Sequence, residues 1–340
     1  MNPLTEHLHH GGSLTRPQIK HAVAALLDEG VALETKADFL AALHSKGETA
    51  AEIAAFVEAL LAHAVNPHLD PAQLPGPVVD ICGTGGDRLN LFNISTTSMF
   101  VVAAAGAVVV KHGNRSITSQ CGGADVLEEL GVRIDLPPAD FMRCVETVGA
   151  GFLFAPHYHP AFKTIAPVRK HLAAQGRTSI FNLLGPLLNP VRPPFQLAGI
   201  FDSSRLEKYA QVLRLLGRKR AWAVHGSGAD EIMPFGVTDG MEATPKGVTD
   251  FQILMDKLGI PHATLDELRG GGRSENAIIL TGILDGSITG AKSDAVLLNA
   301  AAALVVCGIA PGMASGLEFA REQIESGAAL EKLRELQDFR

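Results

Sequence analysis

The spacing of apolar residues changes about a fifth of the way along the chain, and this change constrains the fold more than any other feature. Before it the spacing is helical: Ile19, Val23 and Leu26 share one helix face, and Gly30 stands where that helix would end. After the proline-rich segment 71–77, short aliphatic runs alternate with glycine turns and helical stretches. Such alternation is typical of a mainly parallel sheet with helices on both faces.

We therefore predict an α/β protein with two domains. Residues 1–72 would form a small helical domain, joined by helices from about 163–192, and residues 73–340 would form a larger α/β domain with a mainly parallel central sheet. In the helical part, Thr49 and Glu52 form a capping box that starts a helix. The length of 340 residues fits two domains, and a hydrophobic content of 46% can fill two cores.

Strands are expected at the short aliphatic runs, and helices where the spacing is helical. The expected strands span about 78–81, 108–110, 195–201 and 221–224. The expected helices after the proline-rich segment span about 95–105, 124–130, 163–173, 206–216, 274–284, 294–306 and 314–336. Because the carboxyl ends of parallel strands meet at one edge of a sheet, the loops after the first two strands should lie together.

The composition excludes several classes of function. A formal net charge of −7 removes any general attraction to polyanions, so we do not expect the chain to wrap duplex nucleic acid. The four cysteines lie far apart without C-x-x-C spacing, which argues against a zinc site or a disulfide framework. The N-terminal segment lacks a signal-peptide pattern, and the longest apolar run, 295–309, is too short to cross a bilayer. We expect a cytoplasmic protein.

The first glycine-rich loop has the character of a phosphate cradle. Residues 83–87 (Gly-Thr-Gly-Gly-Asp) directly follow an expected strand, and residues 93–96 (Asn-Ile-Ser-Thr) directly precede an expected helix. Glycines let backbone N–H groups approach an anion, and a helix start adds unpaired donors and the positive end of the helix dipole. A tight turn followed by an ordinary helix cap is the alternative interpretation.

A second polar loop strengthens the phosphate interpretation. Residues 111–116 (Lys-His-Gly-Asn-Arg-Ser) follow the second expected strand and supply two cations, an amide and a hydroxyl. Such a loop is often only a solvated surface, but its expected place beside the first loop favours a ligand with several phosphates. No Ser/His/Asp or Cys/His arrangement is evident, so we expect no nucleophilic catalytic residue; positioning and electrostatics would carry the reaction.

These segments together resemble the anthranilate phosphoribosyltransferase family. The motifs that carry the resemblance are GTGGD (83–87), NIST (93–96), KHGNR (111–115), FAPHYHPA (154–161), PVR (167–169), FNLLGPLLNP (181–190), VHG-x-G-x-DE (224–231) and GG-x-x-ENA (271–277). The resemblance implies a small helical domain and an α/β domain with substrates in the cleft between them, the fold shared with pyrimidine nucleoside phosphorylases. It also implies a homodimer formed through the helical domain. The implied reaction is Mg²⁺-dependent transfer of phosphoribose from phosphoribosyl pyrophosphate (PRPP) to the amino group of anthranilate, a step of tryptophan biosynthesis.

The resemblance assigns site residues in three groups. The PRPP group is Gly83, Gly85, Gly86, Asp87, Asn93, Ile94, Ser95, Thr96, Lys111, Asn114, Arg115, Ser116, Ser119 and Gly123. The anthranilate group is Gly83, His112, Asn114 and Arg169, and the Mg²⁺ group is Ser95, Asp230 and Glu231. Oxygen donors suit Mg²⁺, and a guanidinium can pair a carboxylate through two hydrogen bonds. Without the resemblance, Asp230-Glu231 and Arg169 would be ordinary surface residues. The histidines and tyrosine at 157–159 would be pocket-wall residues.

The chain departs from the family pattern at three positions. Leu91 stands where Ser or Thr is common before FNIST, Gly123 where Ser is common after Cys-Gly, and Arg88 where glycine usually follows GTGGD. The first two changes remove hydroxyl donors near the phosphates of PRPP, and Arg88 adds a charge. Two other functions stay open: phosphorolysis by a pyrimidine nucleoside phosphorylase, and nucleic-acid binding by a non-catalytic relative.

Overall fold

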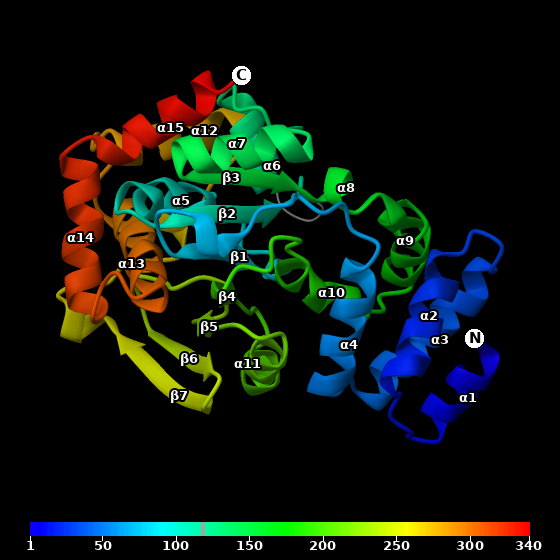
Figure 1. The fold of residues 1–340 in the computed structure, drawn as a ribbon. Helices are drawn as coiled ribbons and strands as arrows, with labels where there is room; N and C mark the ends of the chain where they lie inside the picture. The colour runs from blue at the N-terminus through cyan, green and yellow to red at the C-terminus, as the bar shows by residue number, and fades with distance from the viewer. Residues whose placement is uncertain (117–119) are drawn as a thin grey trace.

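The N-terminal part of the chain is a helical bundle in the computed structural model, which describes residues 1–116 and 120–340 (Figure 1). Its helices are α1 (Asn2–His9), α2 (Arg16–Leu27), α3 (Leu33–Lys46) and α4 (Ala50–Leu61). The expected capping box starts α4: the Thr49 N–H donates to Glu52 Oε2 at 2.9 Å, and the Glu52 N–H donates to Thr49 Oγ1 at 3.2 Å. Helices α9 (Ala166–Ala174) and α10 (Phe181–Leu184) share the apolar core of this bundle.

A seven-stranded sheet forms the centre of the α/β part, in the order β3-β2-β1-β4-β5-β6-β7. The strands are β1 (Val78–Gly83), β2 (Val108–Gly113), β3 (Ala150–Phe154), β4 (Phe195–Gly199), β5 (Arg220–Gly226), β6 (Val237–Thr244) and β7 (Gly247–Leu254). Strands β1 to β5 pair in parallel, and β6 and β7 add an antiparallel hairpin to one edge. The predicted α/β class with a mainly parallel sheet is confirmed.

The two faces of the sheet belong to different apolar cores. Leu197 of β4 contributes to the core beneath α5 and α13, whereas its neighbour Ala198 contributes to the core shared with α11 and the helical bundle. Successive side chains of a strand point to opposite faces, so one strand serves both cores. The remaining helices are α5 (Ile94–Ala104), α6 (Gly123–Glu129), α7 (Pro138–Val148), α8 (Ala155–Tyr158), α11 (Leu206–Leu215), α12 (Arg273–Leu284), α13 (Ala291–Val306), α14 (Met313–Glu325) and α15 (Ala328–Asp338).

The structure corrects several sequence-based expectations. Helix α1 and strands β3, β6 and β7 were not anticipated, and the single helix expected over 314–336 is two helices, α14 and α15. The break falls at Gly327, whose φ of +79° is a left-handed conformation that glycine adopts without strain. Among the helices of the described residues, none has the length and apolar character needed to span a membrane.

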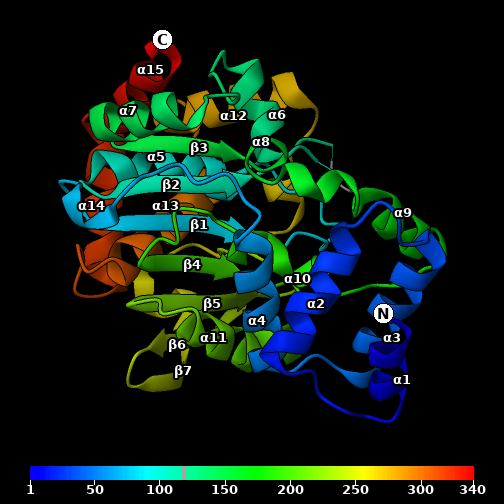
Figure 2. The ribbon, with the colours of Figure 1, turned by 45° about the vertical axis from the view of Figure 1, so that its right-hand side comes forward.

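The strand order places a crevice at one edge of the sheet. Strand β1 lies between β2 and β4, so the connections that leave β1 and β4 turn toward opposite sides of the sheet. Ligands of open α/β sheets bind at the carboxyl ends of strands where the order reverses in this way. The carboxyl ends of β1, β2 and β3 point toward the side on which α9 and the N-terminal bundle lie (Figure 2). A ligand at this edge would therefore face the helical domain.

Candidate functional site

The loop after β1, residues 83–87, packs closely around the carboxylate of Asp230. The Gly85 N–H donates a hydrogen bond to Asp230 Oδ2 at 2.6 Å. A Cβ atom at Gly83 would lie 2.1 Å from the same oxygen, and a Cβ atom at Gly199, the last residue of β4, would lie 1.6 Å from the carbonyl oxygen of Asp230. Both strand ends must be glycine for the backbone around Asp230 to pack this closely. The predicted site residues Gly83, Gly85 and Asp230 are therefore brought together.

Three carboxyl groups, those of Asp87, Asp230 and Glu231, lie close together beside this loop. Burial and then repulsion from the carboxylate of Asp87 raise the pKa of Asp230. Burial and then repulsion from Asp230 raise the pKa of Glu231 to about 8. The ammonium of Lys111 partly offsets this charge. The three carboxyl groups outnumber the single ammonium group, and a bound cation would stabilise their charged forms.

The start of α5 lies beside the same carboxylates. The Ser95 N–H donates to Glu231 Oε1 at 3.3 Å, and the Lys111 ammonium donates to Ser95 Oγ at 3.1 Å and to the carbonyl oxygen of Ile81. The side chain of Asn93 does not cap this helix; its Nδ2 donates instead to the carbonyl oxygen of Cys121 at 3.1 Å. The first turn of α5 thus presents the positive end of its dipole, and its side-chain acceptor is Glu231 rather than the N-cap residue Asn93.

The residues of this cluster fit a magnesium ion shared with a substrate. Within residues 1–116 and 120–340, no group of three or more His, Cys, Asp or Glu side chains is placed to enclose a metal by itself. Mg²⁺ usually keeps several waters and is held by one or two carboxylates together with substrate phosphates. Asp230, Glu231 and the Ser95 hydroxyl are oxygen ligands of this kind, and the two carboxyl groups would lose their protons on binding a divalent cation.

The second polar loop, at the end of β2, is hydrogen-bonded to α6. Gly122 is needed because a Cβ there would lie 2.4 Å from the backbone nitrogen of Ser116. Asp125 Oδ2 accepts from the N–H groups of Ser116 and Gly122, both at 2.9 Å. The guanidinium of Arg115 pairs with both carboxylate oxygens of Glu128. To contact a phosphate, Arg115 would have to leave this partner.

The positions at which the chain departs from the family pattern have specific surroundings. A Cβ at Gly123 would lie 2.9 Å from Thr96 Oγ1, so the hydroxyl of Thr96 occupies the space beside that glycine. Leu91 forms an isolated antiparallel bridge with Arg269, and Arg88 is exposed with a φ of +58°. Asn114 is exposed at the same edge of the sheet, whereas the predicted PRPP residue Ser119 lies outside the described residues.

A row of rings leads from the end of β2 to α9. The centroids of His112 and His159 are 5.2 Å apart, those of His159 and Phe162 are 5.1 Å apart, and those of Phe162 and Phe181 are 5.9 Å apart. The guanidinium carbon of Arg169 lies 6.0 Å from the centroid of Phe181. Burial lowers the pKa of Arg169, which has no ion pair among the described residues. A partly buried, unpaired guanidinium beside aromatic rings can receive an aromatic carboxylate.

Two of the aromatic residues expected at the pocket wall have other surroundings. The hydroxyl of Tyr158 donates to the carbonyl oxygen of Leu136 at 3.2 Å, and its ring packs edge-on against Phe141 at 5.9 Å. Tyr158 is therefore a core residue. The ring of His157 lies 5.2 Å from that of Phe154.

Sequence reasoning missed one residue that fixes the start of α5. Asn276 Nδ2 donates to Asn93 Oδ1 at 3.0 Å, and Asn276 Oδ1 accepts from the Gly271 N–H at 2.9 Å. The signal was present in the GG-x-x-ENA motif, but nothing in the motif alone says that it reaches a residue 183 positions away. Asn276 links α12 to the predicted phosphate cradle.

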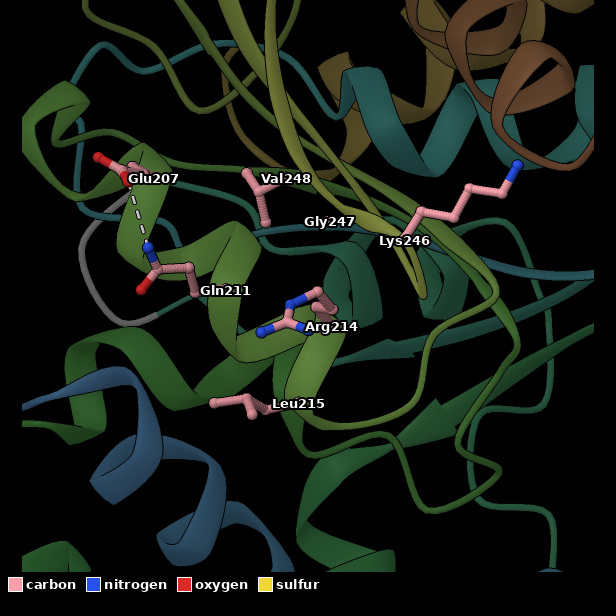
Figure 3. A pocket seen from close by; sticks show the side chains of 7 residues that line it. All are labelled: Glu207, Gln211, Arg214, Leu215, Lys246, Gly247 and Val248. Atoms are coloured by element: carbon pink, nitrogen blue, oxygen red, sulfur yellow. Dashed lines mark hydrogen bonds between the residues drawn. The ribbon is translucent and has the colours of Figure 1, made fainter.

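A shallow groove elsewhere on the surface is not part of this site. It lies between α11 and the turn that joins β6 to β7, and its lining residues are Glu207, Gln211, Arg214, Leu215, Lys246, Gly247 and Val248 (Figure 3). Because β6 runs antiparallel to β5, this turn lies at the amino end of β5, whereas Asp230 follows its carboxyl end. The groove therefore opens at the opposite edge of the sheet.

Comparisons with known proteins agree with this geometry. The family model described as "Glycosyl transferase family, a/b domain" matches residues 75–330, and "Glycosyl transferase family, helical bundle domain" matches residues 2–64. An anthranilate phosphoribosyltransferase of Shewanella putrefaciens is 42% identical over 337 residues, covering 99% of this chain and 96% of the relative. One from Roseiflexus castenholzii is 44% identical over 329 residues, covering 96% and 94%.

Solved structures give the same result. The anthranilate phosphoribosyltransferase of Thermus thermophilus superimposes with a TM-score of 0.90 at 37% identity, covering 99% of this chain and 98% of that one. The Saccharomyces cerevisiae enzyme in complex with PRPP and Mg gives 0.85 at 28% identity, covering 99% and 96%. These relatives give no support to a nucleoside phosphorylase or a nucleic-acid-binding protein. The chain belongs to the anthranilate phosphoribosyltransferase family.

Proposed function

We propose that this protein transfers the phosphoribosyl group of PRPP to the amino group of anthranilate, giving N-(5-phosphoribosyl)anthranilate and pyrophosphate, in tryptophan biosynthesis. The observation that carries the proposal is the packing of Asp230 between the glycine ends of β1 and β4, with Glu231 against the start of α5. This arrangement joins a carboxylate pair to the start of α5, where the N-cap side chain makes no capping bond, at the edge of the sheet where the strand order reverses. A diphosphate with its divalent cation matches this arrangement: the helix start can bind the negative phosphates, and the carboxylates can bind the cation.

The PRPP side of the site would be built from the two loops and the first turn of α5. Backbone N–H groups of the glycine loop and of α5 would bind the phosphates, and Lys111 and the hydroxyls of Ser95 and Thr96 would add charge and hydrogen bonds. The full set proposed is Gly83, Gly85, Gly86, Asp87, Asn93, Ile94, Ser95, Thr96, Lys111, Asn114, Arg115, Ser116, Ser119 and Gly123.

Ser95, Asp230 and Glu231 would hold Mg²⁺. When bound, the ion neutralises the charge of the departing pyrophosphate. The chain's own contribution is to keep both carboxylates in place, through the Gly85 N–H and the Ser95 N–H. The relative solved with PRPP and Mg supports Mg²⁺ as the ion.

The anthranilate side would be built from the end of β2 and from α9. Arg169 would pair the carboxylate, and Gly83, Asn114 and His112 would border the ring and the amine. An aniline-type amine is already neutral at pH 7, so the site needs to orient it toward the anomeric carbon rather than to deprotonate it strongly. Holding the two reactants in line supplies a large part of the rate enhancement without a nucleophilic side chain.

An acceptor of the anthranilate class is also supported by a relative solved with 4-fluoroanthranilate. We further propose that the protein is a cytoplasmic homodimer associating through the helical domain, without nucleic-acid or membrane partners. Light scattering of the purified protein gives the mass directly, and a monomer at micromolar concentration would contradict the dimer.

The reaction is tested by incubating the protein with PRPP, Mg²⁺ and anthranilate and following the loss of anthranilate fluorescence. Mass spectrometry of the product should show phosphoribosylanthranilate. The Asp230→Asn and Glu231→Gln variants should need more Mg²⁺ for half-maximal turnover, and an unchanged Mg²⁺ titration would remove them from the metal site. Turnover of thymidine with phosphate, but not of anthranilate with PRPP, would overturn the proposal.

A further inference from the structure

A row of buried polar side chains crosses the face of the sheet that meets the helical domain. His112 on β2, Asp80 on β1, Gln196 on β4 and Arg218 just before β5 form this polar row. Their exposed fractions are 5%, 0%, 0% and 3%. Burying charged and amide groups costs free energy that burying apolar groups does not cost. The polar row therefore does not serve packing alone.

The side chains of the polar row hydrogen-bond to one short segment, residues 185–189, in the connection between α10 and β4. The ring of His112 bonds through Nδ1 to the carbonyl oxygen of Gly185 at 3.2 Å, and Gln196 Nε2 donates to the carbonyl oxygen of Pro186 at 2.5 Å. Asn189 Nδ2 donates to Asp80 Oδ2 at 3.0 Å. Three residues of the segment are therefore fixed to the sheet by side-chain hydrogen bonds.

The row is also linked within itself. Asp80 Oδ1 accepts from the backbone N–H of His112 at 3.3 Å, and Arg218 Nε donates to Gln196 Oε1 at 2.9 Å. The second bond fixes the amide of Gln196 with its NH₂ group toward Pro186. Asp80 fixes the backbone that carries the His112 ring, and Gln196 fixes the segment whose carbonyl group the ring faces.

This geometry determines which nitrogen of His112 carries the proton. A carbonyl oxygen can only accept, so Nδ1 must donate to Gly185 and is protonated. Burial lowers the pKa of His112 to about 3, so the ring is neutral at pH 7 and Nε2 is a bare acceptor. That nitrogen is buried and has no hydrogen-bond partner among the described residues.

We propose that Asp80 and Gln196 are positioning residues that hold His112 as its Nδ1–H tautomer, so that Nε2 accepts a hydrogen bond from the amine of the acceptor substrate. This inference rests on the proposed function. The Arg169 guanidinium offers donors to a carboxylate and Nε2 offers an acceptor to an N–H group, so the two side chains provide complementary partners for the two groups of an ortho-amino acid. A carboxylate placed at Nε2 is repelled by the lone pair.

The first experiment tests the hydrogen bond between Nε2 and the substrate amine, and it uses the variants His112→Asn and His112→Gln. Asparagine places its amide near the Nδ1 position, and glutamine reaches the Nε2 position with an acceptor oxygen. We expect the KM for anthranilate to rise about tenfold in His112→Asn, the equivalent of one lost hydrogen bond, and clearly less in His112→Gln. The KM for PRPP should stay within about twofold in both. Binding of benzoate, which has no amine, should be equally strong in both variants. Equal losses of anthranilate affinity in the two variants would overturn the proposal.

The second experiment tests, in the protein without substrate, whether Gln196 and Asp80 set the tautomer of His112. Ring nitrogen signals of ¹⁵N-histidine-labelled protein, assigned to His112 by their absence in His112→Asn, should show Nδ1 protonated and Nε2 bare. Gln196→Glu keeps the acceptor for Arg218 but removes the donor to Pro186; it should mix the tautomers and raise the KM for anthranilate. Asp80→Asn provides a second variant if Gln196→Glu does not fold, and Gln252→Glu on the exposed β7 is the matched control.

The outcomes separate this inference from the proposed function. Protonation of Nε2 in the wild-type protein, or an unchanged tautomer and KM in a folded Gln196→Glu protein, would overturn the inference even if PRPP and anthranilate turn over normally. Absence of turnover by the wild-type protein would overturn the proposed function, while the ¹⁵N signals would still decide the tautomer.

Discussion

A single methyl group at the end of β1 should disable the metal side of the site. In Gly83→Ala the new Cβ would lie 2.1 Å from Asp230 Oδ2 and 3.0 Å from the carbonyl oxygen of the same residue. Contacts of this kind are not tolerated below about 3 Å, so the carboxylate must retreat by about 1 Å. The bond that Oδ2 accepts from the Gly85 N–H, 2.6 Å long, would then be lost.

The magnitude follows from that bond. A hydrogen bond to a charged group contributes about 1.5–3 kcal/mol, which corresponds to a factor of about 10 to 150 in an equilibrium constant. We therefore expect the Mg²⁺ concentration for half-maximal turnover, at fixed PRPP and anthranilate, to rise at least tenfold. The KM for anthranilate at saturating Mg²⁺ should rise less than the Mg²⁺ requirement, because Gly83 also borders the acceptor but Arg169 and His112 approach it from other elements.

The control is Gly312→Ala. Gly312 has a φ of −170°, an extended conformation that alanine also adopts, and a Cβ there meets nothing within 4 Å. Both variants should be compared by Mg²⁺ titration and by thermal unfolding. A folded Gly83→Ala protein with the Mg²⁺ dependence of the wild type would refute the claim that this glycine seats a metal-binding carboxylate.

Three further predictions test other parts of the site. Arg169→Ala should weaken anthranilate binding by about 1–3 kcal/mol through loss of a charged hydrogen-bonded pair; a loss of PRPP affinity with unchanged anthranilate affinity would contradict the assignment. Burial lowers the pKa of His112 to about 3 and of His159 to about 4. Below pH 6.5 these histidines are therefore protonated in the unfolded chain but not in the folded chain. The free energy of unfolding should fall by up to about 1.4 kcal/mol per pH unit for each histidine as pH drops from 6.5 toward 4. Chemical denaturation should show a shallower dependence in His159→Gln. Asn276→Ala should raise the KM for PRPP by freeing Asn93, and fluorescence assays at varied PRPP would show no change if the link between α12 and the cradle is unimportant.

The parts of the fold that the sequence predicted are those with a strong local signal. Strands β1, β2, β4 and β5 are aliphatic runs followed by turn residues, and α4 has a capping box; each signal lies within a few residues. The five-residue strand β3 is equally apolar, but a run this short can also belong to a buried helix. Strands β6 and β7 contain few aliphatic residues and have few fully buried positions, which gives a weak pattern.

The site shows the same limit at larger sequence separations. The glycine loops were recognisable because phosphate binding uses consecutive residues. The contact between Asn93 and Asn276 and the bond between Asp80 and Asn189 join residues 183 and 109 positions apart, and only the packed sheet brings them together. The pairing of Arg115 with Glu128 depends on the angle at which α6 leaves its loop, which the spacing of residues does not define.

The crowding of carboxylates leads to a last prediction about the order of binding. Asp87, Asp230 and Glu231 lie together, so an anionic substrate approaching without a cation meets net repulsion, and Lys111 is already bonded to Ser95 and the carbonyl oxygen of Ile81. Mg²⁺ would relieve the repulsion, and PRPP would complete the ligands of the ion. Each should therefore strengthen binding of the other by the same factor, since coupling between two ligands is reciprocal. Calorimetric titration of PRPP with and without Mg²⁺, and of Mg²⁺ with and without PRPP, should give equal factors of about tenfold or more, the usual size of such coupling. Tight PRPP binding in the presence of a chelator would show instead that the N–H groups of α5 and the glycine loop suffice to bind the phosphates. It would also show that the negative net charge of the chain, −7, does not repel PRPP at this site.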